Sequence, residues 1–144
     1  MILPDVNLLL HAYNSSSPRH FVARLWWEAC LEGDRKIRLP WVVALGFLRL
    51  STHHRIAANP LAVDVACEIV ASWLVRPQVS VLHPGARHAE ILFELLRAAG
   101  TGGNLTTDAH LAALAIEHQV ELQSTDGDFS RFPGLHWRNP LNTE

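Results

Sequence analysis

Short apolar runs separated by stretches with helical spacing set the strongest limit on how this chain folds. We expect strands at residues 1–5, 36–39, 78–82 and 121–124, and the stretch around His136 and Trp137 is a candidate fifth. Parallel strands need crossover connections, which are usually helices. The alternation therefore predicts an α/β chain, folded as a three-layer α/β/α sandwich around a central parallel sheet of four to five strands.

Local signals indicate where several of the helices begin and end. Ser17-Pro18 and Asn59-Pro60 each join a capping residue to a proline, a combination typical of a helix start. We expect the second of these helices to run to about Val75. Gly100 follows an amphipathic stretch and is typical of a C-terminal stop. The expected helices are 7–13, from Ser17 onward, 41–51, 59–75, 87–99 and 107–118.

The composition fits one small domain that includes residues 1–144. Apolar residues make up 49% of the 144, enough to form a continuous core. No apolar stretch reaches the roughly 18 residues that a membrane-spanning helix needs. Pro4 and Asp5 interrupt the N-terminus where a secretory signal would be apolar. We therefore expect a cytoplasmic protein without membrane contacts.

Cysteine usage and charge narrow the possible ligands. Cys30 and Cys67 lie in predicted helices, where we expect them to be buried as apolar residues rather than to form a disulfide or bind zinc. The formal net charge of −2 argues weakly against an ordinary nucleic-acid binder. The basic residues are eleven arginines and the single Lys36, and arginine presents a planar fork that suits phosphate.

Four aspartates lie where a strand ends or a helix begins: Asp5, Asp108, Asp126 and Asp128. Ligands of open parallel sheets bind outside the carboxyl ends of the strands. Carboxylates that converge there repel one another unless a hard cation neutralises them. The pattern predicts a metal-dependent acid pocket and, with it, metal-assisted attack on a phosphodiester.

Each aspartate also has a purely structural interpretation. Asp5 could cap the helix that follows it. Asp108 could be a first-turn residue that the helix dipole favours. Asp126 and Asp128, on either side of Gly127, could shape a turn. Each of these explanations is sufficient for its own aspartate. Acids at three separate strand–helix junctions, however, favour a shared site.

The order of motifs resembles that of the PIN-domain ribonucleases, and more narrowly the VapC-type toxins of bacterial toxin–antitoxin pairs. The motifs span nearly the whole chain and are specific only in combination. They are Leu3-Pro4-Asp5-Val6-Asn7-Leu8-Leu9, Phe47-Leu48-Arg49-Leu50-Ser51-Thr52, Asn104-Leu105-Thr106-Thr107-Asp108-Ala109-His110, and Ser124-Thr125-Asp126-Gly127-Asp128-Phe129.

The resemblance implies RNA cleavage at a Mg²⁺ centre, with Mn²⁺ as a substitute, and inhibition by a cognate antitoxin. By position, Asp5 looks like the central metal ligand, Asp108 like the second and Asp126 like the third. Asp128 looks like a supporting acid. Family resemblance and the many apolar residues also lead us to expect a homodimer, with an amphipathic antitoxin helix bound in a groove.

Further polar residues are candidates for supporting roles. Asn7, Asn104 and Thr125 could orient carboxylates, waters or phosphate oxygens. Asn104 could equally be an ordinary loop residue. Arg49 could contact phosphate or form a structural ion pair.

One position departs from the family pattern. A glutamate often precedes the Phe-Leu-Arg-like run in these enzymes, and here Gly46 stands in its place. Glycine inside a helix costs up to roughly 1 kcal/mol against alanine, so we expect close packing or backbone access to favour it. A second metal site would then be weaker, unless Glu90 or Glu94 substitutes.

Other residues and other functions fit less well. The histidines lack consistent ligand spacing, and we expect the five tryptophans to be buried in the core or in dimer contacts. A PIN scaffold that binds RNA or a partner without cutting is the main alternative, favoured by Gly46. An aspartyl-phosphate receiver ranks last, because Asp5-Val6-Asn7 lacks the second acid of that motif.

Overall fold

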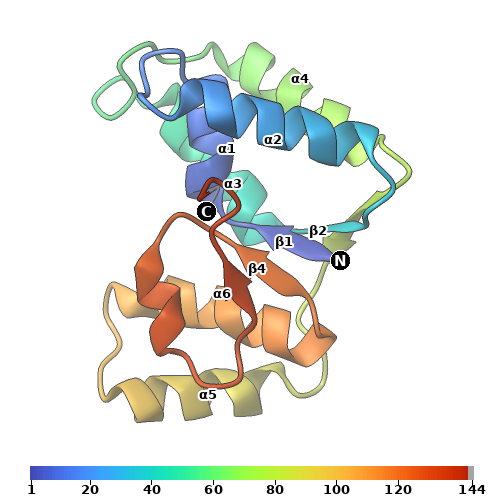
Figure 1. The fold of residues 1–144 in the computed structure, drawn as a ribbon. Helices are drawn as coiled ribbons and strands as arrows, with labels where there is room; N and C mark the ends of the chain where they lie inside the picture. The colour runs from blue at the N-terminus through green and yellow to red at the C-terminus, as the bar shows by residue number, and fades with distance from the viewer. Residues whose placement is uncertain (143–144) are drawn as a thin grey trace.

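The computed structural model describes residues 1–142, and its centre is a sheet of five parallel strands (Figure 1). The strand order is β3-β2-β1-β4-β5. This confirms the predicted parallel sheet and the fifth strand near Trp137. The bounds are β1 (Ile2–Pro4), β2 (Ile37–Pro40), β3 (Val79–Leu82), β4 (Glu121–Gln123) and β5 (Trp137–Arg138).

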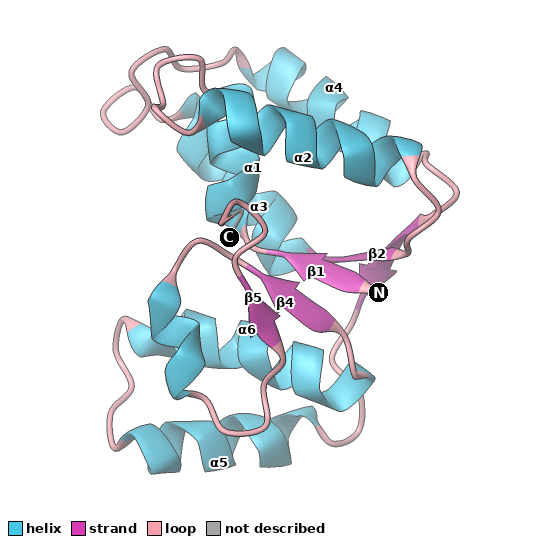
Figure 2. Cartoon of the chain, in the orientation of Figure 1, coloured by secondary structure: helices cyan, strands magenta, loops and turns pink. Residues whose placement is uncertain are grey.

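Helices cover both faces of this sheet, which confirms the three-layer sandwich (Figure 2). One face carries α1 (Val6–Tyr13), α2 (His20–Glu32), α3 (Trp41–Thr52) and α4 (Val63–Leu74). The other face carries α6 (Leu105–His118), with α5 (His88–Ala99) packed on the outer side of α6. A short 3-10 helix, η1 (Gly127–Arg131), connects β4 to β5.

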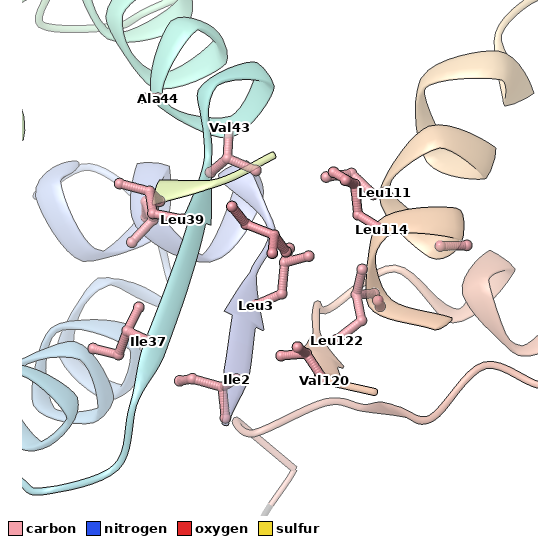
Figure 3. Packing of buried hydrophobic residues seen from close by; sticks show 14 of the residues in the cluster. Ile2, Leu3, Ile37, Leu39, Val43, Ala44, Leu111, Leu114, Val120 and Leu122 are labelled. Carbon is pink, nitrogen blue, oxygen red and sulfur yellow. The ribbon is translucent and has the colours of Figure 1, made fainter. Parts of the chain in front are cut away.

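The core lies on both sides of the central strand, as Figure 3 shows. Ile2 and Leu3 of β1 are 1% and 0% exposed, since helices cover both faces of the strand. Leu122 of the neighbouring β4 is equally buried, and Leu111 and Leu114 of α6 pack toward it. Burial on both faces explains why the central strand β1 is a continuous apolar run without alternation.

Aromatic side chains fill the layer between α1–α4 and the sheet. Trp73 donates a hydrogen bond from Nε1 to the Tyr13 hydroxyl at 2.9 Å and meets Phe47 and Trp27 edge to face. Trp27 and Trp73 are therefore core residues, as expected. Trp41, at the start of α3, is 46% exposed, so it lies outside the core, and the alternative of a dimer contact stays a prediction for it.

Two predicted helix starts are wrong. The helix expected from Asn59 begins at Val63, because the Asn59 amide donates to Ser16 Oγ at 3.0 Å in the preceding loop instead of capping. The helix expected from Ser17 begins at His20, because Ser17 Oγ accepts from Arg19 N in a turn before it. In both places the residue–proline pair forms the approach to the helix.

Smaller differences concern one helix start and one cysteine. The helix expected from Thr107 begins two residues earlier, at Leu105. Gly100 ends α5 with a left-handed φ of 72°, as predicted. Cys30 is half-buried but Cys67 is exposed, so burial was wrongly predicted for Cys67, which lies on the outer side of α4. Within residues 1–142 no helix combines the length and apolar character needed to cross a membrane.

Candidate functional site

The strand order turns at β1, and the predicted acids gather there. From β1 the chain moves outward to β2 and β3, and it later returns to β4 and β5 on the opposite side of β1. Adjacent parallel strands whose connections diverge leave a crevice at their carboxyl ends. Pro4 pairs with Gln123 in the register, so Asp5 and Ser124 follow side by side.

Asp5 is held in place by two short hydrogen bonds. Its Oδ2 accepts from Ser124 Oγ at 2.7 Å, and its Oδ1 accepts from Val6 N at 2.7 Å. The second bond caps α1, so the capping interpretation is also correct. The residue is 7% exposed, which fixes the carboxylate at the edge of the sheet.

Ser124 joins three of the polar groups at this edge. Its hydroxyl donates to Asp5, accepts from Asn7 Nδ2 at 3.3 Å and accepts from Asp126 N at 3.0 Å. A hydroxyl has one donor and two acceptor positions, so all of its hydrogen-bonding capacity is used. Asn7 therefore lies one hydrogen bond from Ser124, and its supporting role stays a prediction.

The two remaining acids of the C-terminal motif lie at the start of η1. Asp126 caps this helix, and its Oδ1 accepts from Asp128 N at 2.9 Å. The turn interpretation is therefore correct for this pair as well. Asp126 is half-buried and Asp128 is exposed, so Asp128 lies on the solvent side of the cluster.

Asp108 completes the cluster from the first turn of α6. Burial, followed by the negative charges of Asp5, Asp126 and Asp128, raises its pKa to about 6, whereas the charge of Arg131 lowers it. Burial also raises the pKa of Asp5, against the hydrogen bonds from Ser124 and Val6, and Asp126 adds to the increase. Mutual effects of this kind require like charges within a short distance. We call Asp5, Asp108, Asp126 and Asp128 the acid cluster.

The acid cluster has the donor chemistry of a hard divalent cation. Its oxygens are all carboxylate, the ligand type that Mg²⁺ and Mn²⁺ prefer. Among residues 1–142, no three histidine, cysteine or acidic side chains approach closely enough to surround one ion by themselves. Mg²⁺ suits such a site, because it retains several waters and takes one or two carboxylates. The three-aspartate ligand set remains a prediction.

The other candidates lie in less defined surroundings. Arg49 is exposed on α3, and Asn104 is exposed at the start of α6, where its side chain makes no capping bond. Thr125 is half-buried beside the cluster. The sequence interpretation missed Ser124 and Arg131. Ser124 could have been found from its place directly after a strand that neighbours β1.

Gly46 is a point of close approach between α3 and α1. A Cβ at this position would lie 3.2 Å from Val6 Cγ2 and 3.6 Å from Val6 Cβ. Close packing, one of the two predicted explanations, therefore accounts for the glycine. Neither Glu90 nor Glu94 of the outer α5 is among the groups that shift the pKa of Asp5 or Asp108. Glu90 instead pairs with Arg87 at 3.5 Å.

Comparison with known families shows to which family this chain belongs. The model of the PIN domain matches residues 2–135. The chain belongs to the PIN-domain family. Its curated relatives place it with the VapC ribonucleases: it is 43% identical to Ribonuclease VapC33 of Mycobacterium tuberculosis over 141 residues, covering 98% of this chain and 99% of the relative. It is 41% identical to Ribonuclease VapC37 of the same species over 140 residues, covering 97% of each.

Solved structures support the same fold for this PIN domain. VapBC2 from Rickettsia felis, bound to a DNA fragment from its promoter, matches with a TM-score of 0.69 at 18% identity, covering 96% of this chain and 98% of that chain. VapC20 of Mycobacterium tuberculosis, described as a toxin that cleaves the sarcin–ricin loop, matches with a TM-score of 0.68 at 20% identity, covering 94% and 99%. At these identities the likeness shows a shared fold and nothing more.

Proposed function

We propose that this VapC-type protein is an endoribonuclease, the toxic member of a toxin–antitoxin pair, which hydrolyses RNA phosphodiesters at the acid cluster. The observation that carries the proposal is the bonded pair Asp5–Ser124 at the turning point of the sheet, together with the charges of Asp5, Asp126 and Asp128, which all raise the pKa of Asp108. Membership of the VapC ribonucleases supports it.

In the proposed reaction, Asp5, Asp108 and Asp126 would hold a Mg²⁺ or Mn²⁺ ion together with waters, and Asp128 would support them from the solvent side. Such an ion would supply Lewis acidity for the attack of water on the phosphodiester. Ser124 and Asn7 orient Asp5. The deprotonated form of Asp108 is the one that can bind the ion, so its raised pKa makes the site sensitive to mild acid.

Partners follow from the same family and from exposed apolar side chains. Solved relatives include toxin–antitoxin complexes, which supports a cognate antitoxin for this chain. Phe21, Val22 and Leu25 of α2 are 65%, 42% and 45% exposed, an amount of apolar surface that a protein partner would cover. We propose an antitoxin helix and a second copy of this chain as the partners.

A non-catalytic binding module is the second candidate, and Gly46 favours it. The packing against Val6 leaves no room for a further carboxylate without movement of α1 or α3. The four retained acids weigh against it, since their mutual repulsion brings a pure binding module no benefit.

The experiment that separates the two functions is sequencing of new RNA 5′ ends in cells after induction of the protein. Wild-type protein should create discrete new ends, and Asp5→Ala should create none at equal abundance. Asp34→Ala, in the exposed turn after α2, is the matched control and should behave like wild type. If wild-type cells show no new 5′ ends beyond those in Asp5→Ala cells, the binding module is the better account.

A further inference from the structure

The backbone carbonyl of Ser124 is a buried acceptor at the carboxyl end of β4. Ser124 is 0% exposed, and a buried carbonyl without a donor costs free energy comparable to a lost hydrogen bond. The neighbouring strand β5 is the expected source of that donor (Figure 2). One rung of this ladder runs from Leu122 N to His136 O at 2.9 Å, and the next runs from Ser124 N to Arg138 O at 3.1 Å.

The donor for the following rung is missing, because residue 140 is a proline. The pairing of Gln123 with Arg138 places Ser124 beside the next residue, Asn139. In a parallel ladder, the Ser124 carbonyl would then accept from the amide of residue 140. Pro140 has no N–H and cannot donate. The backbone of β5, which ends at Arg138, therefore leaves the Ser124 carbonyl without a partner.

The side chain of Trp137 supplies the missing bond. Its indole Nε1 donates to the Ser124 carbonyl at 3.1 Å. Among residues 1–142, no backbone amide donates to this oxygen. The ring is half-buried and packs against the apolar core, which limits its motion. A tryptophan side chain thus completes a ladder that the proline interrupts.

Two bonds from β5 fix the backbone of Ser124 on both sides of its Cα. Its amide is held by the Arg138 carbonyl, and its carbonyl is held by the Trp137 indole. Because both flanking peptide planes are fixed, the direction of the Cα–Cβ bond is fixed as well. The hydroxyl on that bond donates to Asp5 Oδ2 at 2.7 Å and accepts from Asp126 N at 3.0 Å. Two members of the acid cluster therefore depend on the orientation of one serine.

We propose that Trp137 is a positioning residue of the acid cluster. Its indole N–H replaces the amide that Pro140 lacks, and so holds Ser124 in the orientation that orders Asp5 and Asp126. This role rests on the proposed function, because the groups that Trp137 arranges are the ligands of the proposed cation. Trp137 acts through Ser124, as residues behind a metal ligand commonly do.

The variant that tests this role is Trp137→Phe, because phenylalanine keeps an aromatic ring but has no N–H. Trp26→Phe is the matched control. Trp26 is also half-buried, and its Nε1 donates at 3.0 Å to the side chain of Gln123, the residue before Ser124. Each variant therefore loses one indole hydrogen bond to neighbouring residues of the same chain segment, and only Trp137→Phe loses the bond to Ser124.

Two measurements separate positioning from general structural support. Hydrogen exchange followed by NMR at the Asp126 amide reports on its bond to the Ser124 hydroxyl. Exchange at the amide of Leu114, a fully buried residue of α6, reports on global opening. Isothermal calorimetry with Mn²⁺ reports on the acid cluster as a metal site, and urea denaturation gives the stability of each variant.

Trp137→Phe should speed exchange at the Asp126 amide roughly tenfold, the factor that corresponds to one lost buried hydrogen bond. Exchange at Leu114 should change by a smaller factor. The Mn²⁺ affinity should fall about tenfold, as for other residues that orient metal ligands. Trp26→Phe should leave the Asp126 exchange rate and the Mn²⁺ affinity at the wild-type values. In the wild-type protein, the indole proton of Trp137 should exchange far more slowly than that of the exposed Trp41.

Unchanged exchange at Asp126 or an unchanged Mn²⁺ affinity in Trp137→Phe would overturn the proposal. Equal acceleration at Asp126 and Leu114 would also overturn it, because that pattern indicates a general loss of stability. If Trp137→Phe does not fold, the wild-type indole protons decide, and equally fast exchange at Trp137 and Trp41 would refute the bond. Failure of the wild-type protein to bind Mn²⁺ or cleave RNA would refute the proposed function, whereas hydrogen exchange would still decide whether Trp137 orders Ser124.

Discussion

Ser124 shows how much of the acid cluster depends on a residue without charge. The four aspartates were predictable from the sequence, because acids after apolar runs are conspicuous and parallel strands bring such positions to one edge. Ser124 and Arg131 were not predicted, because their importance depends on strand register and on the path of η1. For Asp5 the structural interpretation does not exclude the functional one, since Oδ1 caps α1 while Oδ2 accepts from Ser124 at the edge of the sheet.

Replacement of Ser124 by alanine should destabilise the protein by about 1–3 kcal/mol, because the buried groups of Asp5, Asn7 and Asp126 each lose a hydrogen-bond partner. It should also raise the pKa of Asp5 further, since this hydrogen bond lowers it. Urea denaturation measures the stability. Ser130→Ala, at an exposed position on η1, is the control and should have little effect. Equal urea midpoints for Ser124→Ala and Ser130→Ala would show that the hydrogen bonds of Ser124 do not stabilise the fold.

Replacement of Asp108 by asparagine should stabilise the metal-free protein at pH 7.5. The fold raises the pKa of this carboxyl to about 6 from 3.8, so ionised Asp108 is unfavourable in the native state. That penalty is fully present well above pH 6 and shrinks as pH falls, and it disappears below about pH 3.8, where the carboxyl is protonated in both the native and the unfolded state.

Thermal melts of wild type and Asp108→Asn across this pH range test whether the substitution stabilises the protein. The variant should melt at a higher temperature than wild type at pH 7.5, and the difference should shrink toward zero near pH 4. A destabilised variant at pH 7.5, or a difference that grows in acid, would show that Asp108 is not strained by its neighbours.

At the scale of elements, the sequence predicted which helices and strands exist better than where they begin. Ser17-Pro18 and Asn59-Pro60 carry the composition of helix starts, but tertiary partners, such as Ser16 for Asn59, place them in the preceding turns. Contacts between helices could not be predicted from the sequence. His88 Nε2 and His110 Nδ1 lie 2.9 Å apart between α5 and α6, although neither histidine has a recognisable motif.

Gly46→Ala should not gain the stability that alanine normally gives inside a helix, because its Cβ would press on Val6 Cγ2 at 3.2 Å. In a Val6→Ala background that obstacle is absent, and the same substitution should stabilise by about 0.5–1 kcal/mol. Denaturant titration of the four proteins completes the cycle. Equal effects of Gly46→Ala in both backgrounds would show that the helices do not constrain this position.

Gly85→Ala should be clearly destabilising, because a Cβ there collides with the Glu117 carboxylate. Glu117 accepts hydrogen bonds from Gly85 N at 2.8 Å and Arg87 N at 2.9 Å, which tie the approach to α5 onto α6. We expect a loss of about 1–3 kcal/mol by chemical denaturation. Gly102→Ala meets only an ordinary contact at 3.4 Å and should cost much less.

At the scale of the whole molecule, the strand order explains why acids from distant parts of the sequence share one place. Receiver-like sheets follow the order 2-1-3-4-5, whereas this sheet runs β3-β2-β1-β4-β5, which removes the aspartyl-phosphate receiver from consideration. The alternation of apolar runs and helices was enough to predict three layers. It could not predict which apolar helix faces stay exposed, because exposure depends on how α2, α3 and α4 pack.

The central claim is that the acid cluster binds a divalent cation, and Mn²⁺ titration by isothermal calorimetry tests it most directly. Wild-type protein should bind Mn²⁺ at neutral pH, Asp5→Asn and Asp108→Asn should each lose most of the affinity, and Asp64→Asn at the start of α4 should retain it. The same Mn²⁺ affinity in wild type, Asp5→Asn and Asp108→Asn, or no binding to the wild-type protein, would contradict the account.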